Sequence, residues 1–551
     1  MKKNTTDEPK SIEETLPLAG IDKTTLHNEA VDLETALTLT GYGKFHLLLM
    51  LASLPGVMTN VFDTSAMSYV LPSAVCDLHL SSLDKGLLNS ITYAGMISSA
   101  FMWGFLSDSL GRQRLLCLGF FLDVTCGVIS SFSQNFQVLV VFRFFSGFII
   151  SGPHAMLISF LAEFHSHKYR ARMIILTGVY GALANISIPG LAWLIIPQSW
   201  SWSLFGGHIT YNSWRVFVAV CTIPSFLAGC LMTCFDESPK FLMSRGQTDE
   251  ALRVLRKVYS INTGKHPDTY PVKALLSGRI ETQSSKVTLE EQDSFEKILT
   301  LVTSGWKQVK PLFRLPHITS AILVFSIQFG ALLSMNTIRL WMPQLFFIME
   351  DFAKLQEDAA DSSLDGYSLC EMLAFSKQLE RSKLNQSAVA FEDLETCTVN
   401  VVKSTMYLNS VIVGGVTGVF YLFAGSIINA MGRKRMLILG FLVATVCVAS
   451  IYWSRNSTVT IAIIAVYLAA SSVTGKAVVS VVVDLFPTSL RAMAVSLTMM
   501  FGRSGALLGN LLFPILLDLS CSVPFFVVSG VTFAGACLSA LLPIHLGKNA
   551  D

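Results

Sequence analysis

Charged residues are scarce in this sequence. Of its 551 residues only 14% are Asp, Glu, Lys or Arg, whereas 52% are hydrophobic, and the mean hydropathy is +0.54. Because soluble globular proteins carry roughly 25% charged residues, this composition argues against a soluble enzyme, a disordered chain and a nucleic-acid-binding protein. The net charge of +2 gives no reason to expect binding to polyanions. The composition predicts a polytopic protein of the lipid bilayer with no nucleic acid partner.

Several patterns that carry chemistry are also missing. The sequence has no G-x-x-x-x-G-K-[ST] motif for nucleotide phosphates, no cluster of metal ligands and no nucleophile beside a general base. We therefore expect no enzymatic activity, no metal and no cofactor, and any energy for transport would come from a solute or proton gradient. Residues 1–44 lack the apolar core of a secretory signal and are interpreted as a disordered cytosolic tail.

Twelve apolar segments are long enough to cross a bilayer as helices, which takes about 20 residues each. Their length favours helices over the short alternating strands of a closed barrel. Six segments precede the middle of the chain, at 45–71, 86–107, 115–132, 136–162, 173–196 and 214–235. Six follow it, at 318–347, 405–431, 436–453, 459–483, 491–517 and 523–546.

Basic residues in the short loops predict the orientation of these spans. With the N-terminus inside, the inner loops hold most of the Lys and Arg, whereas the outer loops hold little beyond Lys85 and Arg455. Both termini are therefore expected in the cytosol. The predicted organisation is a tail (1–44), a first bundle (45–235), a cytosolic linker (236–316), a second bundle (317–546) and a short tail (547–551).

An acidic loop at 350–403 interrupts the second bundle and is expected to face the outside or a vesicle lumen. It carries a glycosylation sequon at Asn385, and a second sequon at Asn456 lies in the outer turn between the ninth and tenth spans. Both are accessible to glycosylation in this topology.

Two cysteines in the acidic loop suggest a disulfide. A bond between Cys370 and Cys397 is predicted for an oxidising compartment. Cys76 and Cys521 are expected on the same side of the membrane, so other pairings stay open.

A repeat relates the two bundles. GFLSDSLGRQR at 104–114 and GSIINAMGRKR at 425–435 follow the second and eighth spans at an offset of 321 residues. The same offset pairs EFHSHKYR at 163–170 with DLFPTSLR at 484–491, acid with acid and arginine with arginine. A single register over this distance predicts two parallel six-helix halves about a pseudo-two-fold axis along the membrane normal, an arrangement of transporters.

The first copy of the repeat has features of a conformational latch. Gly104 would permit close helix packing, and Gly111 would allow a sharp turn before the basic pair. Asp108 is expected at the membrane edge, where its carboxylate can cap the N-terminal end of the helix that starts near Arg491.

Ion pairs would complete this latch. Arg112 and Arg114 can pair with Glu163, at about 1 kcal/mol for each surface pair. Such weak pairs suit a latch that opens in every cycle, whereas the alternative is that the charges only set the topology. The predicted latch residues are Gly104, Asp108, Gly111, Arg112, Arg114, Glu163, Arg170, Arg433, Arg435, Asp484 and Arg491.

These motifs resemble those of the major facilitator superfamily. Its inner-loop motif is reproduced as Gly104-x3-Asp108-x2-Gly111-Arg112-x-Arg114, and RFFSG at 143–147 resembles its fourth-helix motif. DESPKFL at 236–242 resembles the P-E-S-P-R of the sugar-porter and organic-ion branches, with Asp236 in place of Pro.

Two longer stretches narrow the resemblance. VLPSAVCDLHLSSLDKGLL at 70–88 and SWRVFVAVCTIPS at 213–225 closely resemble the synaptic vesicle glycoprotein 2 and related-protein family. The resemblance covers 45–546 and implies an all-α fold of twelve transmembrane helices and alternating access. Two departures stand out: the vertebrate vesicle glycoproteins have a long repeat-built luminal domain where this loop has no obvious repeats, and Asn429 replaces the second latch aspartate.

Charged residues inside apolar spans are costly and usually functional. Asp63 lies deep in the first span, and Arg503 lies about three turns into the eleventh. Because an arginine keeps its proton, Arg503 needs an anionic partner, either Asp63 or a ligand, so binding or proton coupling and a structural salt bridge both stay open. Asp123 and Arg143 are candidates for structural pairs, and further substrate-binding candidates are Gln328, Asn336, Arg339 and Lys476.

The leading hypothesis is a secondary active carrier that moves a small organic ion or polar metabolite by alternating access, with a proton or another ion as coupled solute. We expect a monomer in the plasma membrane or an intracellular vesicle. The rival hypothesis is a non-transporting membrane protein that uses the fold for regulation or partner binding. Buried charges favour transport, but a structural ion pair would leave the same pattern.

Overall fold

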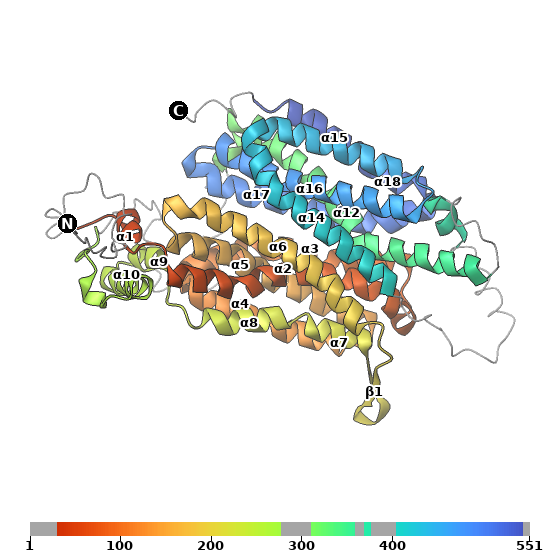
Figure 1. Ribbon diagram of the computed structural model, residues 1–551, viewed down its shortest axis with the longest axis horizontal. Helices are drawn as coiled ribbons and strands as arrows, with labels where there is room; N and C mark the ends of the chain where they lie inside the picture. The colour runs from red at the N-terminus through yellow and green to blue at the C-terminus, as the bar shows by residue number, and fades with distance from the viewer. Residues whose placement is uncertain (1–29, 277–309, 359–367, 376–403, 544–551) are drawn as a thin grey trace, which may run out of the picture. The chain divides into compact units, whose positions relative to one another are not determined.

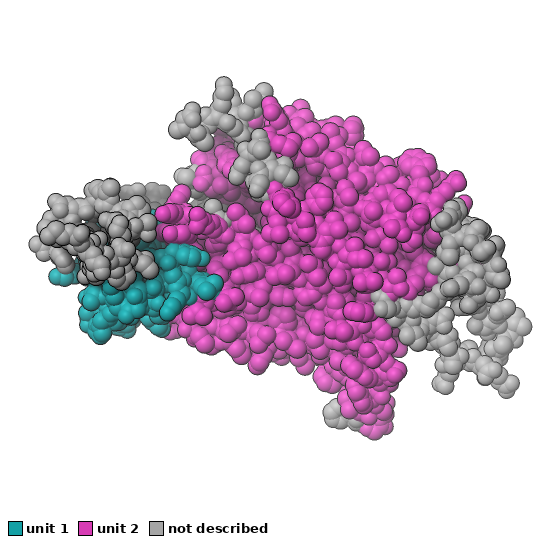
Figure 2. Space-filling view, viewed as in Figure 1, with its two compact units in different colours: residues 1–47, 238–283 teal, residues 48–237, 284–551 magenta. Residues whose placement is uncertain are grey.

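The computed structural model describes residues 30–276, 310–358, 368–375 and 404–543. The chain divides into two compact units, shown in Figure 2. Unit 1 comprises Met1–Leu47 and Ser238–Gln283, and unit 2 comprises Leu48–Glu237 and Ser284–Asp551.

Unit 2 is built from two sets of long helices (Figure 1). The first half contains α2 (Lys44–Leu78), α3 (Ser82–Leu110), α4 (Arg112–Ser131), α5 (Phe136–Phe164), α6 (His167–Ile195), α7 (Ser213–Val220) and α8 (Ile223–Met232). The second half contains α12 (His317–Asp358), α14 (Ser404–Met431), α15 (Arg433–Ile451), α16 (Ser457–Leu485), α17 (Thr488–Leu519) and α18 (Ser522–Ala540). An antiparallel hairpin of β1 (Ser201–Leu204) and β2 (Ile209–Asn212) joins α6 to α7.

The predicted all-α membrane fold is confirmed. In the described part of the chain, 11 helices are long and apolar enough to cross a membrane, with α7 and α8 taken as one span. The remaining predicted span corresponds to α3, a helix of 29 residues.

The sixth predicted span is not one continuous helix. It is interrupted between Val220 and Ile223. Pro224 follows directly in the first turn of α8 and has no N–H to donate to the Val220 carbonyl, so the i to i−4 hydrogen bond cannot form there.

The two halves of unit 2 are joined by apolar contacts at one end of the bundle. We call the end that carries β1 and β2 the hairpin end, and the end at which α4, α6, α15 and α17 begin the latch end. At the hairpin end one buried cluster draws on both halves, including Leu71 and Phe217 from the first and Phe346 and Phe513 from the second. A second buried cluster, at the latch end, contains residues of the second half only.

Unit 1 combines part of the N-terminal tail with the linker. It contains α1 (Leu33–Leu39), α9 (Pro239–Ser244) and the amphipathic α10 (Thr248–Thr263). Asn262 of α10 donates through Nδ2 to the carbonyls of Thr40 and Gly41 at 3.1 and 2.9 Å, and its Oδ1 accepts from the Phe45 N–H at 3.0 Å.

The predicted disorder of the tail is therefore wrong for residues 30–44. Val31 forms a parallel bridge with Leu275 of the linker. The Tyr270 hydroxyl donates to the Ala36 carbonyl at 2.6 Å, and burial raises the pKa of Tyr270. These contacts order the tail because the linker supplies backbone and side-chain partners that the tail lacks by itself.

Candidate functional site

Polar side chains from both halves meet in the interior of unit 2. The Tyr93 hydroxyl of α3 donates to Asn336 Oδ1 of α12 at 2.9 Å. Arg339, one turn further along α12, donates through Nη2 to the Tyr93 hydroxyl at 3.1 Å and to Asn336 Oδ1 at 2.8 Å. Two of the predicted binding residues, Asn336 and Arg339, are thus brought together with a tyrosine from the opposite half.

A second polar contact between the halves involves Arg503. Its Nη1 donates to the Ser151 hydroxyl of α5 at 2.9 Å, and Tyr93 lies nearby. His154, one turn along α5 from Ser151, lies close enough to Lys476 of α16 and to Arg503 to interact with both charges. Lys476 is surrounded by protein, yet its side chain is exposed, so it faces solvent from within the bundle.

Glycines place Arg503 at this position. A Cβ atom added to Gly505 would lie 2.2 Å from the Phe329 carbonyl oxygen, and one added to Gly509 would lie 2.1 Å from the Thr337 hydroxyl. Only glycine at these positions lets the α17 backbone approach α12 so closely. The close approach fixes α17 on α12 and leaves Arg503 directed at α5 of the other half.

We call Arg339, Lys476 and Arg503 the cationic cluster. In the described structure none of the three has a carboxylate within ion-pair distance. His154 Nδ1 also has no hydrogen-bond partner among the described residues. Gln328, the remaining predicted binding residue, contacts Met499 on α17 at 3.9 Å, and its Oε1 is buried without a described partner.

Asp63 belongs to a separate group within the first half. Arg143 Nη1 lies 3.9 Å from Asp63 Oδ1, and Ser146 donates to Asp63 at 3.3 Å and to Asp123 at 2.8 Å. Asp123 also accepts from the Ser225 hydroxyl at 2.5 Å. We call Asp63, Asp123 and Arg143 the acidic triad, and all three are buried.

The alternative that Asp63 pairs with Arg503 is wrong in this structure. Asp63 faces Arg143 because α2 and α5 belong to the same half, whereas Arg503 is held against Ser151 on another part of α5. The alternative in which Arg143 and Asp123 form structural pairs is closer to the observed arrangement.

The repeated loops form equivalent ion pairs at the latch end. Arg112, the first residue of α4, pairs with Glu163 of α5, and Arg433, the first residue of α15, pairs with Asp484 of α16. Both partners are shifted by the same 321 residues. Each pair lies within one half, so in this conformation it ties helices of that half together.

The turns before these pairs are also equivalent. Gly111 has a φ of 97° and Gly432 a φ of 81°, a backbone conformation that disfavours any residue with a Cβ. Glu237, which the sequence analysis did not select, accepts from the Arg112 and Gln113 N–H groups at 3.0 and 3.1 Å. Its carboxylate satisfies free N–H groups at the start of α4. The position of Glu237 within the motif DESPKFL could have identified it as a candidate from the sequence.

Some of the other predicted latch contacts are not formed by the described residues. The predicted close packing at Gly104 is wrong here, because a Cβ added there would have no atom within 4 Å. Arg114 is exposed and pairs with no described residue, so its predicted bond to Glu163 is not found.

The side chain of Asp108 lies outside the described residues. Arg170 donates from Nε to the Ala162 and His165 carbonyls, Arg435 is exposed, and Arg491 is half-buried.

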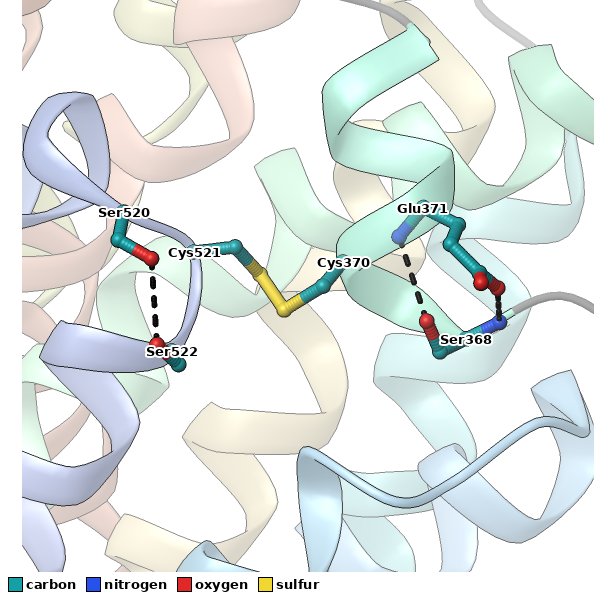
Figure 3. Close-up of a disulfide and its surroundings, with 6 residues drawn as sticks. All are labelled: Ser368, Cys370, Glu371, Ser520, Cys521 and Ser522. Carbon is teal, nitrogen blue, oxygen red and sulfur yellow. Dashed lines mark hydrogen bonds between the residues drawn. A yellow bond between two sulfur atoms is a disulfide. The ribbon is translucent and has the colours of Figure 1, made fainter.

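The predicted disulfide is corrected by the structure. Cys370 bonds to Cys521, at the start of α18, and not to Cys397 (Figure 3). The short helix at 369–375 brings Cys370 against α18, whereas Cys397 lies outside the described residues. Ser368 begins this helix and exchanges hydrogen bonds with Glu371, which lower the pKa of Glu371.

The two predicted glycosylation sites lie in different parts of the chain. Asn456 is exposed at the start of α16, where its Oδ1 accepts from the Thr458 N–H at 2.8 Å. Asn385 lies outside the described residues. Glycosylation at both asparagines stays a prediction.

Sequence comparisons identify relatives of this chain. Residues 48–346 match the family described as "Sugar (and other) transporter", and residues 395–548 match the "Major Facilitator Superfamily". Synaptic vesicle glycoprotein 2B of Rattus norvegicus is 24% identical, over 93% of this chain and 85% of its own. Synaptic vesicle glycoprotein 2A of Rattus norvegicus is 34% identical, over 42% of this chain and 31% of its own.

Solved structures confirm the fold. The xylose transporter XylE from E. coli, in a partially occluded inward-open conformation, has a TM-score of 0.61 at 15% identity and covers 91% of this chain and 100% of its own. The proton:xylose symporter XylE bound to 6-bromo-6-deoxy-D-glucose has a TM-score of 0.59 at 17% identity, over 90% of this chain and 94% of its own. The chain therefore belongs to the sugar (and other) transporter family of the major facilitator superfamily.

Proposed function

We propose that this protein is a secondary active transporter that moves a small polar solute across a membrane by alternating access. The observation that carries the proposal is the set of polar contacts between the halves, Arg503 to Ser151 and Arg339 to Tyr93. A solute bound among these side chains touches both halves and can therefore respond to their relative movement.

The conformation of unit 2 supports this mechanism. The halves share a buried apolar cluster at the hairpin end, and Lys476 is exposed from within the bundle. A site closed at the hairpin end and reached from the latch end is one of the two end states that alternating access requires. With the predicted cytosolic termini, this state is inward-facing.

The acidic triad supports coupling to a proton. Two carboxylates, Asp63 and Asp123, lie close enough to interact and share the single guanidinium of Arg143. One carboxylate is therefore without a balancing charge, and a proton on it would neutralise the group. Because Asp63 is held less tightly than Asp123, we assign the coupled proton to Asp63.

The rival function is a vesicle membrane protein that does not transport. Its support is that the relatives described above carry the name synaptic vesicle glycoprotein, which states no substrate. The cationic cluster and the acidic triad favour transport, because neither is needed to hold an apolar helix bundle together.

Uptake by purified protein in liposomes separates these two functions. The assay uses labelled sugars, organic anions and organic cations, with and without an imposed pH gradient. We expect saturable uptake of at least one solute, accumulated above equilibrium only with the gradient. Arg455→Ala, which alters an exposed residue in the turn between α15 and α16, is the matched control and should transport like the parent. A folded protein that takes up none of the solutes would support the rival function.

A further inference from the structure

Among the residues that the structure describes, no carboxylate balances the charges of the cationic cluster. Arg503 and Arg339 contact only hydroxyl and amide groups, and Lys476 has no ion pair with a described carboxylate. An arginine keeps its proton under all relevant conditions. Arg339 and Arg503 are half-buried between helices, and partly desolvated cations without a counter-charge are unfavourable, so this arrangement calls for an anion.

The buried carboxylates near the middle of the first half, Asp63 and Asp123, belong to the acidic triad, and neither forms an ion pair with the cationic cluster in the described structure. Arg143 lies 3.9 Å from Asp63, and the Ser146 hydroxyl lies within hydrogen-bonding distance of both Asp63 and Asp123. Glu350, further along α12, accepts from the Met406 N–H at 3.0 Å. The counter-charge for the cationic cluster must therefore come from outside the described side chains.

The members of the cluster converge on one place. Tyr93 accepts from Arg339 and lies near Arg503. His154 interacts with both Arg503 and Lys476. Tyr93 and His154 come from the first half, whereas the three cations near them come from the second.

The donor groups favour an anion over a neutral sugar. Guanidinium and ammonium groups donate hydrogen bonds and accept none. A sugar hydroxyl needs acceptors as well as donors, whereas a carboxylate, sulfonate or phosphate accepts only and matches the fork of an arginine. Arg339 and Arg503 offer two such forks, and Lys476 adds a compact charge.

We propose that the transported solute is a small organic anion whose carboxylate, sulfonate or phosphate group is bound by Arg339, Lys476 and Arg503. This inference rests on the proposed transport function. The first half contributes Tyr93, Ser151 and His154 around the same anion, so binding and release are tied to the relative position of the halves.

Binding is tested separately from transport, in detergent, by the thermal stability of the full-length protein. The probes are small carboxylates, sulfonates and phosphate esters, each compared with its uncharged amide or alcohol, and xylose. We expect at least one anion to raise the melting temperature in a saturable way while its uncharged counterpart has no effect. Lys476→Gln and Arg503→Gln should each weaken this anion at least tenfold, and Arg503→Lys should weaken it less.

The control variant is Arg455→Gln, which removes an equal charge from an exposed position in the turn between α15 and α16. It should bind the anion like the parent. Stabilisation by xylose that survives Lys476→Gln and Arg503→Gln would overturn the inference, as would the lack of a response to every anion. Anion binding that depends on the cluster, combined with no uptake in liposomes, would instead overturn the transport function and leave the inference standing.

Discussion

At the scale of single residues, Arg143 holds the acidic triad together. It is 1% exposed and is the only described cation beside Asp63 and Asp123. Removing it would leave two buried carboxylates facing each other. Breaking a buried ion pair in this way costs about 3–5 kcal/mol.

We therefore predict that Arg143→Gln lowers the melting temperature far more than Asp63→Asn does. In Asp63→Asn the guanidinium keeps Asp123 as its partner, so the triad stays neutral without a proton. If Asp63 carries the coupled proton, Asp63→Asn should also lose accumulation driven by the pH gradient while keeping exchange of the solute. Thermal melts and liposome uptake on both variants test this, and unchanged gradient-driven uptake in Asp63→Asn would reassign the proton.

The sequence predicts which charges are buried better than it predicts their partners. Asp63, Arg503, Lys476 and Arg339 stand out because a charge within an apolar span is conspicuous. Which of them meet depends on how the helices pack. His154 was missed because a single histidine in an apolar helix has no distinguishing pattern, although Ser151 lies one turn away on the same face.

At the scale of helices, the two latch pairs are equivalent in position but not in burial. The side chains of Arg112 and Glu163 are 18% and 6% exposed, whereas those of Arg433 and Asp484 are 38% and 35% exposed. Exposed ion pairs contribute about 0–1 kcal/mol because water screens them, and a buried pair loses more when it is broken.

Arg112→Ala should therefore destabilise the protein more than Arg433→Ala. We expect a loss of about 2 kcal/mol for the first, between the exposed and buried limits, and of less than about 1 kcal/mol for the second. Thermal melts of the two variants beside Arg114→Ala measure the difference. Equal shifts for the two variants would mean that the burial of Glu163 does not govern the strength of its pair.

Helix positions follow well from the sequence because apolar length alone predicts them. The structure differs from these predictions at two kinds of place. One is a residue that interrupts a helix within an apolar span, as Pro224 does, and the other is a segment whose hydrogen-bond or disulfide partner is distant in the sequence. The tail at 1–44 is polar as a whole, so its composition suggests disorder. Residues 30–44 nevertheless include apolar side chains such as Leu37, which is buried, and Asn262 and Tyr270 of the linker supply their hydrogen bonds. The Cys370–Cys521 bond likewise joins residues 151 positions apart.

At the scale of the whole chain, the repeat predicts two equivalent halves but not the individual side-chain contacts between them. The offset of 321 residues correctly relates Arg112–Glu163 to Arg433–Asp484 and Gly111 to Gly432. The helix pairs that join the halves, α3 with α17 and α6 with α14, are related by the same offset. Individual polar contacts between the halves, such as Arg503 with Ser151, have no equivalent, because the offset leads to Ala182 and Ser472. They depend on the relative position of the halves, which alternating access changes in every cycle.

A disulfide across the hairpin end tests that movement. A Cβ atom added to Gly86 of α3 would lie 2.9 Å from Pro514 Cγ of α17, so cysteines at these two positions are within disulfide reach. We predict that oxidation of the Gly86→Cys, Pro514→Cys double variant stops uptake, because the hairpin end can no longer open, and that reduction restores it. Anion binding in detergent should survive, because the site is still reached from the latch end. Each single variant is the control and should transport under the same oxidant. Full uptake by the oxidised double variant, with the bond verified by mass spectrometry, would show that transport does not require the hairpin end to open.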